Sequence, residues 1–396
     1  MTAGERSTAR AGEPPRGRSR VGRATRRGAA RWRGAREAIV RRSVATGRLR
    51  RAAAVTHAAL ACACGAEPLD EGWSIAPPPS PGGAAQRASA DGWEIVQAFD
   101  FNLDGMADVL WNDSARSRMA IWFMDGTRLL APGPAIAGPR GGEWIVRAND
   151  FNFDGMGDVV WRHAGRPLIS VWLMHGGQPL AQGPILPGPP GEGWTARAFD
   201  FNGDGMSDVL WNQPEQNVIT VWLMNGSELL APGPMLPGPI GGRWEVGGGA
   251  DIDGDGMADV VWNDVERNLM SVWLMNGTQP IAQGPVIPGP VGEGWITIRA
   301  NDFNLDGNAD VLWAHEEKGM AAVWLMNGAE LLAPGPTLPG PAGDGWSARA
   351  AGDVNRDGMA DIVWQRDGAS EMAVWLMDGS QMLAPGPVIP GPHDGG

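Results

Sequence analysis

The sequence predicts an all-β protein made of six similar units that follow a disordered N-terminal segment. Two observations carry this prediction. An acidic motif that first reads DFNLDGMADVLW recurs with its first Asp at residues 100, 150, 200, 251, 302 and 353, at a step of 50 or 51 residues. Runs with the composition of strands flank each copy, and no segment has the spacing of a helix. Repeats of this length form solenoids, arrays or propellers.

The N-terminal segment, residues 1–65, contains 16 Arg and 3 Glu and lacks apolar periodicity over about its first 45 residues. Such a composition predicts disorder. Its last part has positive charge, a short apolar run and small residues before Cys62 and Cys64, which is the layout of an export signal. It resembles a bacterial lipoprotein signal, and that resemblance implies a lipid anchor on Cys62 or Cys64. The alternative is a basic tail without a specific role.

The remaining residues, 66–396, hold 16 basic and 42 acidic residues. This charge excludes a nucleic-acid partner, whose phosphates require Lys and Arg. No cysteine follows Cys64, so disulfides, thiolate zinc sites and a cysteine nucleophile are excluded there. The apolar run before Cys62 is too short to span a bilayer, and no other segment qualifies as a membrane span.

The unit at residues 194–238 shows the expected strands in order. WTARAFD leads into the acidic loop, SDVLW follows it, VITVWLMNG comes after a polar turn, and SELLAPGPMLPGP is a weaker strand interrupted by Pro. In VWLM, residues 221–224, apolar side chains alternate onto both faces, so the sheet is covered on both sides. Stacked four-stranded sheets of this kind predict a β-propeller, with the Pro-rich strand at the outer edge.

A hairpin turn is expected after the third strand of each unit. Asn-Gly at 225–226, 276–277 and 327–328, and Asp-Gly at 125–126 and 378–379, favour two-residue turns with positive φ at both central residues. His175 with Gly176 is the divergent copy.

Six complete blades are expected, and their bounds are about 92–141, 142–192, 193–242, 243–293, 294–344 and 345–396. Residues 66–91 contain Gly-Trp and a Pro-rich run, and form a linker or a degenerate blade fragment. A single six-bladed ring is the main prediction. The alternative is a seven-bladed ring with one blade made from fragments or supplied by a partner.

The acidic loop places oxygen-bearing side chains at positions 1, 3, 5 and 9, with Gly at position 6. This order resembles the start of an EF-hand, but position 12 is Trp in every copy where an EF-hand needs Glu, and no helices flank the loop. Three or four carboxylates in one loop repel one another without a cation. The alternative is an ordinary turn that binds no metal.

The pattern D-x-[DN]-x-D-G-x-x-D between strands resembles FG-GAP and VCBS repeats over residues 92–392. The resemblance implies a propeller with about six structural Ca²⁺ ions, one per repeat, each held by positions 1, 3, 5 and 9 and the backbone carbonyl of position 7. The implied ligands are Asp100, Asn102, Asp104, Met106 and Asp108; Asp150, Asn152, Asp154, Met156 and Asp158; Asp200, Asn202, Asp204, Met206 and Asp208; Asp251, Asp253, Asp255, Met257 and Asp259; Asp302, Asn304, Asp306, Asn308 and Asp310; Asp353, Asn355, Asp357, Met359 and Asp361.

Each repeat also carries three Trp residues. Two of them lie inside apolar strands and are expected in the core. The first of each trio follows a Gly-rich turn and is a candidate ligand-facing residue that stacks on sugar rings: Trp93, Trp144, Trp194, Trp244, Trp295 and Trp346.

Catalysis is not expected. His163, His175, His315 and His393 lack repeated counterparts and are interpreted as exposed loop residues, and no phosphate-binding or hydrolase motif occurs. We expect a monomeric, non-enzymatic adhesion or recognition module for glycan or protein, secreted or anchored at the surface of a bacterium. The alternatives are a hydrolase or lyase acting on cell-surface polysaccharide and a purely structural spacer.

Overall fold

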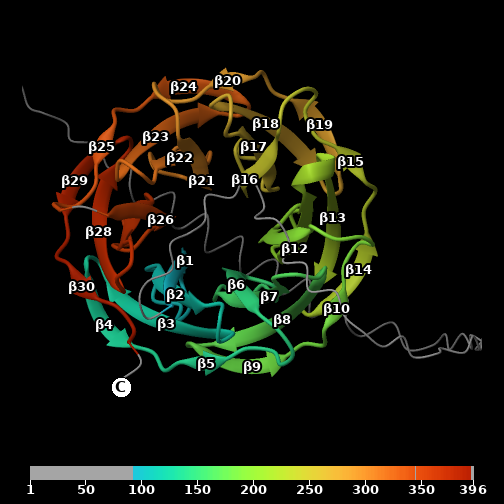
Figure 1. Ribbon diagram of the computed structural model, residues 1–396, viewed down its shortest axis with the longest axis horizontal. Coiled ribbons are helices and arrows are strands. Elements are labelled where there is room, and N and C mark those ends of the chain that lie inside the picture. Colours follow the sequence, from blue (N-terminus) through green and yellow to red (C-terminus); the bar gives the residue numbers. More distant parts are fainter. Residues whose placement is uncertain (1–91, 344, 394–396) are drawn as a thin grey trace, which may run out of the picture. The chain divides into compact units, whose positions relative to one another are not determined.

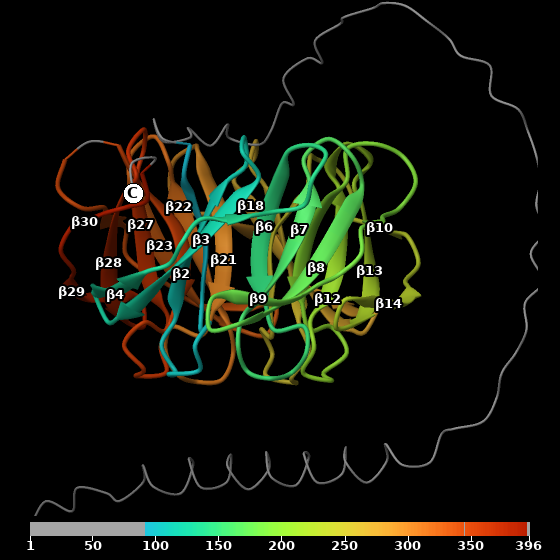
Figure 2. The same cartoon turned by 90° about the horizontal axis from the view of Figure 1, so that it is seen from below.

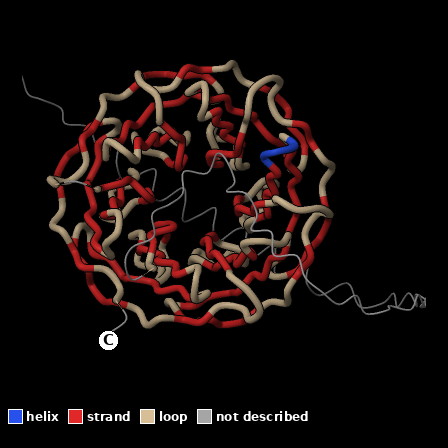
Figure 3. The backbone as a smooth tube through the Cα atoms, viewed as in Figure 1, coloured by secondary structure: helices blue, strands red, loops and turns tan. Residues whose placement is uncertain are grey.

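The computed structural model describes residues 92–343 and 345–393. The predicted export signal with Cys62 and Cys64, and the fragment at 66–91, lie outside these ranges. The described residues form strands and one three-residue 3₁₀ helix, η1 (Pro214–Gln216), which is blue in Figure 3. No helix in this part of the chain has the length and apolar character needed to cross a membrane.

The strands form six antiparallel sheets, one per repeat, which we number as blades 1 to 6. Blade 1 contains β1 (Glu94–Phe99), β2 (Asp108–Asp113), β3 (Arg118–Asp125), β4 (Arg128–Pro132) and β5 (Ile136–Ala137). Blade 2 contains β6 (Trp144–Asn149), β7 (Asp158–His163), β8 (Leu168–His175), β9 (Gln178–Gln182) and β10 (Leu186–Pro187). Blade 3 contains β11 (Thr195–Phe199), β12 (Asp208–Gln213), β13 (Val218–Asn225), β14 (Glu228–Pro232) and β15 (Leu236–Pro237). Blade 4 contains β16 (Glu245–Ala250), β17 (Asp259–Asp264), β18 (Leu269–Asn276), β19 (Gln279–Gln283) and β20 (Ile287–Pro288). Blade 5 contains β21 (Trp295–Asn301), β22 (Asp310–His315), β23 (Met320–Asn327), β24 (Glu330–Pro334) and β25 (Leu338–Pro339). Blade 6 contains β26 (Trp346–Gly352), β27 (Asp361–Arg366), β28 (Glu371–Asp378), β29 (Gln381–Pro385) and β30 (Ile389–Pro390).

The six blades are arranged in a ring around a common axis (Figure 1). The first strand of each blade lies nearest the axis and the fourth lies at the circumference. Figure 2 shows the ring from its side, with the connecting loops gathered at its two faces. The predicted all-β propeller is therefore confirmed.

Each blade has the four predicted strands in sequential antiparallel order and a fifth strand of two residues. In blade 3 the fourth and fifth strands share one edge of β13: Trp222 pairs with Pro232, and Ile219 pairs with Leu236. Proline lacks an N–H group, so its place at the outer edge leaves no ladder donor missing.

The hairpin turns after the third strands differ by one residue from the prediction. Asn225 pairs with Glu228, so the two loop residues are Gly226 and Ser227, with φ of +59° at Gly226. Ser227 is not among the residues with positive φ, and Gly at the first loop position is typical of a type II′ turn. The strand extends one residue further than the Asn-Gly motif alone indicates.

The core consists of six apolar clusters, each between two neighbouring blades. The cluster between blades 3 and 4, for example, joins Leu210 and Val221 to Trp244 and Val260. The second and third Trp of each repeat contact each other, as Trp211 and Trp222 do with ring centroids 5.6 Å apart. The prediction that these two Trp fill the core is confirmed, since all twelve are buried.

The ring closes with six blades. At every junction the residue at position 8 of the acidic loop donates its backbone N–H to the carbonyl oxygen of the position-1 Asp of the preceding blade, over 2.6–2.8 Å. These pairs are Gly157 with Asp100, Ser207 with Asp150, Ala258 with Asp200, Ala309 with Asp251, Ala360 with Asp302, and Ala107 with Asp353. Blade 6 thus contacts blade 1 as the other neighbours contact each other, and the seven-bladed alternative is wrong.

Candidate functional site

The acidic loop is built around the Asp at position 1. In blade 1, Asp100 Oδ1 accepts hydrogen bonds from the backbone N–H groups of Asn102 and Leu103, and its Oδ2 accepts one from Gly105 over 2.9 Å. Leu103 has a φ of +63°, a left-handed conformation that a residue with a branched side chain rarely adopts. The carboxylate of Asp100 therefore holds the backbone in a tight, strained turn.

Positions 3 and 5 continue this pattern with one hydrogen bond each. Asn102 Oδ1 accepts from the N–H of Asp104 over 2.9 Å, and Asp104 Oδ1 accepts from the N–H of Met106 over 2.8 Å. Each carboxylate oxygen can accept more than one contact, so these bonds leave lone pairs available for a cation.

Position 9 is the buried member of the set. Asp108 Oδ2 accepts a hydrogen bond from the N–H of Phe101, and Oδ1 accepts one from the N–H of Met124 on β3, over 3.1 and 3.0 Å. The same two bonds recur at Asp158, Asp208, Asp259, Asp310 and Asp361. This carboxylate fastens the loop to the third strand of its own blade.

Burial shifts the protonation of these carboxyls. It raises the pKa of Asp108 to about 7, and the charges of Asp104 and Asp100 add to the rise. At the equivalent positions of the other blades, the pKa is raised to about 7 for Asp158, Asp208, Asp259 and Asp361, and to about 6 for Asp310. A nearby cation would favour the charged form of each.

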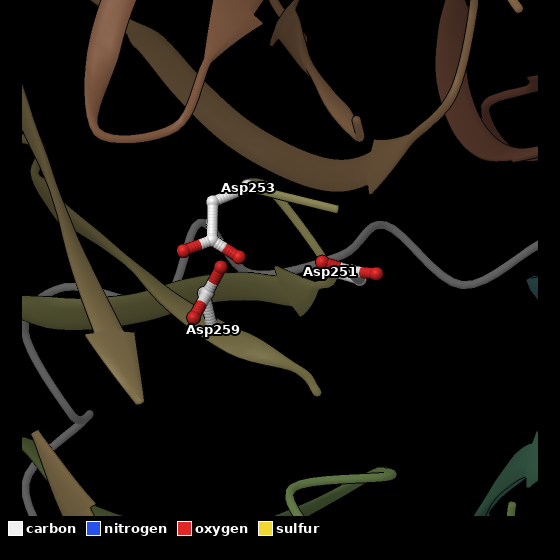
Figure 4. Close-up of side chains that lie close together, drawn as sticks. All are labelled: Asp251, Asp253 and Asp259. Atoms are coloured by element: carbon white, nitrogen blue, oxygen red, sulfur yellow. The ribbon is translucent and has the colours of Figure 1, made fainter. Parts of the chain in front are cut away.

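The loop of blade 4 is the most acidic, because it has Asp at position 3. Asp251, Asp253 and Asp259 each offer a carboxylate oxygen, and these atoms lie within 4.8 Å of one another (Figure 4). In the described part of the chain no other group of three acidic, His or Cys side chains is as close together. Oxygen ligands gathered in this way suit a hard cation such as Ca²⁺.

Each predicted ligand set spans the acidic loop and the first residue of the second strand, and in blade 4 the structure brings three of its carboxylates together. The donor atoms are carboxylate or amide oxygens throughout, and they fit calcium by their chemistry. Calcium binding itself stays a prediction.

The first Trp of each repeat lies in the core, contrary to the prediction of a ligand-facing rim. None of the six is more than 7% exposed, and Trp194 is the most exposed of them. Trp93 and Trp346 border cavities, but their rings pack against neighbouring side chains rather than presenting an open face. Apolar side chains of the preceding blade cover these residues, which is why a single repeat does not reveal their burial.

Two of the four His residues also differ from the prediction. His163 and His315 are buried, and their rings meet those of Trp144 and Trp295 at centroid distances of 5.2 and 5.4 Å. Burial lowers the pKa of both His residues. His163 is the last residue of β7 and His315 is the last residue of β22. His175 and His393 are exposed, as expected.

An apolar surface on the fourth strands was missed by the sequence reasoning. One Leu or Ile per blade stands on the fourth strand with 57–66% of its surface exposed: Leu130, Leu180, Leu230, Ile281, Leu332 and Leu383. We call this set the outer apolar row. The signal was present in the sequence, as the second apolar residue of each LLAP-like segment.

In a comparison with known protein families, five segments of the sequence match the FG-GAP-like repeat: residues 100–161, 150–211, 200–262, 251–313 and 302–364. No curated protein matches the sequence. Each matched segment spans two successive acidic loops, which agrees with the repeat defined above.

Several solved structures are similar at low identity. The Photorhabdus luminescens Tc holotoxin pore is 19% identical with a TM-score of 0.47, and the match covers 75% of this chain and 14% of that one. An Agrocybe aegerita lectin described as recognising non-reducing terminal N-acetylglucosamine is 19% identical with a TM-score of 0.45, covering 76% of this chain and 80% of that one. Kluyveromyces lactis Hsv2 is 11% identical with a TM-score of 0.38, covering 72% and 74%.

The family match extends over most of the propeller, and its repeats coincide with the blades and their acidic loops. The chain belongs to the FG-GAP-like repeat family.

Proposed function

We propose that this protein is a non-enzymatic recognition module, stabilised by calcium, that binds a protein partner through the outer apolar row. A β-propeller with FG-GAP-like repeats fits a recognition or binding module. Calcium, the partner and the surface are the parts that this proposal adds.

The outer apolar row carries the proposal. Large apolar side chains exposed at repeated positions mark interaction surfaces more often than scattered ones do. The row is extended by residues before the fifth strands of blades 2, 3, 4 and 6, each with about half of its surface exposed: Ile185, Met235, Val286 and Val388. Residues 66–396 carry a net charge of -26, so charge complementarity favours a partner with a basic surface around an apolar patch.

Calcium would act as a structural ion. The residues that would hold it are those of positions 1, 3, 5 and 9 and the carbonyl of position 7 in each loop. Bound calcium would neutralise carboxylates that the fold crowds together and keeps partly buried. The loops contain no flanking helices whose angle an ion could change, which supports a structural rather than a sensor role.

Non-enzymatic function is supported by how the acidic and His side chains are used. The loop carboxylates accept backbone hydrogen bonds, as Asp100 and Asp108 do, and are thereby fixed in the turn. His163 and His315 are enclosed beside Trp rings. A hydrolase or lyase would need an accessible acid and base pair, which neither set provides.

A location outside the cell is part of the same proposal. It is supported by the sequence layout before Cys62 and Cys64, and it agrees with the proposed calcium sites, since calcium is abundant outside cells. Radiolabelled palmitate incorporation in cells that express the full chain would test the anchor, with Cys62→Ser and Cys64→Ser variants as controls.

The binding surface can be tested with a protein array and a glycan array probed with the calcium-loaded full chain. The variant Leu130→Ser, Leu230→Ser, Leu332→Ser is expected to lose the protein signals. A matched control changes Ile240 and Val291 to Ser, which are fully exposed on the segments between blades. Glycan signals that survive in the Leu variant would instead favour a glycan site elsewhere. Blank arrays would favour a spacer, and depolymerisation of a surface polysaccharide would favour the enzyme.

A further inference from the structure

The strands nearest the axis place Arg at one equivalent position in three blades. Arg147 pairs with Val160 in blade 2, Arg197 with Leu210 in blade 3, and Arg299 with Leu312 in blade 5. The equivalent residues of blades 1, 4 and 6 are Gln97, Gly248 and Ala350. The first strands lie around the axis, so these three Arg side chains are brought together from distant parts of the sequence.

The three Arg residues line one cavity of about 290 Å³, to which all six blades contribute residues. Arg162 and Arg349 complete its cationic lining, and Glu245 and Glu316 are the acidic residues that line it. Five guanidinium groups thus face two carboxylates. Such an excess of positive charge stands out in a protein whose body is strongly acidic.

Only one of the five forms ion pairs, although the charge of Glu245 acts on Arg197 and that of Glu94 acts on Arg147. Arg349 forms ion pairs with Glu316 at 2.9 Å and Asp367 at 3.0 Å. Among the described residues, Arg147, Arg162, Arg197 and Arg299 form no ion pair. Arg147 and Arg299 each donate to the carbonyl oxygen of the preceding residue, and Arg299 also donates to that of Val96, while its Nε has no acceptor.

The electrostatic effect of this arrangement is unfavourable in the absence of an anion. Burial, with a smaller contribution from the charge of Arg197, lowers the pKa of Arg299 to about 9 and that of Arg162 to about 10. Burial likewise lowers the pKa of Arg147, and neighbouring Arg charges contribute. Burial also raises the pKa of Glu245, Glu316 and nearby Glu94, which weakens the compensation that these carboxyls offer.

The neighbouring strands add an unpartnered hydroxyl and open space. Thr297 lines the cavity, and only 6% of its surface is exposed. Its Oγ1 has no hydrogen-bond partner. In β16 the residues 247–249 are all Gly, and a Cβ at Gly247 would lie 1.8 Å from Thr297 Oγ1. The hydroxyl therefore fills the space beside Gly247, whereas a Cβ at Gly248 would meet no atom nearer than 3.6 Å, which leaves room beside the Arg side chains.

We propose that this axial cavity binds a small tetrahedral oxyanion, phosphate or sulfate, through Arg147, Arg197 and Arg299. Guanidinium groups bind such oxyanions with paired hydrogen bonds, and they do so most strongly where water is scarce. The hydroxyl of Thr297 adds a neutral donor. The anion is either free or part of an ester, since both present the same oxygens.

Isothermal titration of the calcium-loaded full chain, desalted to remove free calcium, tests the site. The probes are sodium sulfate, sodium phosphate and glucose 6-phosphate, at ionic strength held constant with chloride, and glucose is the uncharged control. Binding of sulfate and phosphate indicates a free ion, and tighter binding of glucose 6-phosphate indicates an ester. No binding by any of the three anions, or equal binding of glucose, overturns the proposal.

Arg197→Gln and Arg299→Gln locate the site. Each is expected to weaken anion binding at least tenfold, and to leave the melting temperature without anion equal or higher, because a buried like charge is removed. A purely structural Arg would give a lower melting temperature instead. Arg128→Gln, at an exposed residue of β4, is the matched control. If both Arg197→Gln and Arg299→Gln leave the affinity for the anion unchanged, the proposal is overturned.

Gly248→Glu provides an independent test. A Cβ at Gly248 meets no atom nearer than 3.6 Å, so a side chain fits there and brings a carboxylate to the Arg cluster. This internal anion is expected to abolish sulfate binding and to raise the melting temperature. Retained sulfate binding in this variant contradicts the assignment.

Discussion

The backbone N–H of Ala107 in blade 1 donates a hydrogen bond to the carbonyl oxygen of Asp353 in blade 6, over 2.6 Å. The two residues are more than 240 positions apart, yet their contact repeats the one between Gly157 and Asp100 in adjacent blades. The acidic loops therefore form a continuous ring of contacts around one face, and each loop touches the loop before it. Because each loop contacts the loop before it, an ion that bound one loop would also support its neighbour.

Replacing Gln365 weakens the junction that closes the ring. Its Oε1 accepts from the N–H of Ile95 and its Nε2 donates to the carbonyl of Trp93, over 2.7 and 2.8 Å. Gln365→Met leaves both buried backbone groups unsatisfied, and we expect the free energy of unfolding to fall by about 2 kcal/mol. Urea denaturation measures this change.

The control for that variant is Asn212→Leu, at the equivalent position of blade 3. Asn212 Oδ1 has no hydrogen-bond partner, so a smaller loss is expected there. An equal loss in both variants would show that the closing junction gains nothing from Gln365.

Gly188 is required by close packing under a Trp ring. A Cβ at this residue would lie 2.4 Å from Cη2 of Trp211. Gly188→Ala is expected to lower the free energy of unfolding by about 1–3 kcal/mol through overpacking. Gly165→Ala, at a turn where the added Cβ meets no atom within 4 Å, should be nearly neutral in the same thermal melt. A neutral Gly188→Ala would mean that the Trp ring moves freely.

Asp104 and Asp108 separate the metal role of the loop from its structural role. Asp104→Asn keeps an Oδ1 that can accept from Met106, so stability in chelator should not change, while one calcium ion per chain is lost. Asp108→Asn places an amide N–H₂ against the N–H of Phe101 or Met124, and should cost about 1–3 kcal/mol even in chelator. Equal behaviour of the two variants would refute this division.

The buried carboxyls predict a pH dependence for the metal-free protein. The pKa of Asp108 is raised to about 7 in the folded state from an ordinary value of 3.8, so between these values the folded chain binds more protons than the unfolded one. The stability that the protonated carboxyl of Asp108 contributes is therefore fully present below about pH 4, and it is lost as the pH rises through about 7. Denaturant midpoints in EDTA, measured from pH 4 to 8, check the direction.

Calcium is expected to remove most of that decline, because a cation favours the charged carboxylates. The stabilisation by calcium should therefore grow with pH over the same interval. A calcium effect that is equal at pH 4.5 and pH 7.5 would contradict the assignment of these carboxyls to the ion.

The architecture was predictable because its signals are local and repeated. The step of 50 or 51 residues, the Gly at position 6 and the Pro-rich fourth strand each reflect the geometry of a single blade. The six-fold count followed from the number of acidic loops, and the closing contact of Ala107 with Asp353 confirms it. The Asn-Gly turns were displaced by one residue because strand pairing extends to Asn225.

What escaped prediction depends on neighbouring blades. Trp194 follows a Gly-rich turn and reads as exposed, but blade 2 contributes Val160 and Val171 to the cluster that covers it. The sequence around His163 is typical of a loop, but in the structure its ring packs against that of Trp144. Arg197 and Arg299 are about 100 residues apart, and only the closed ring brings them to one cavity.

The central claim, six loops that bind structural calcium, is tested most directly by metal analysis of the purified chain together with its melting temperature. After desalting from calcium buffer, mass spectrometry of the metal content should give about six calcium ions per chain, and excess EDTA should lower the melting temperature strongly. A chain that carries no calcium and melts at the same temperature with and without EDTA would contradict the account.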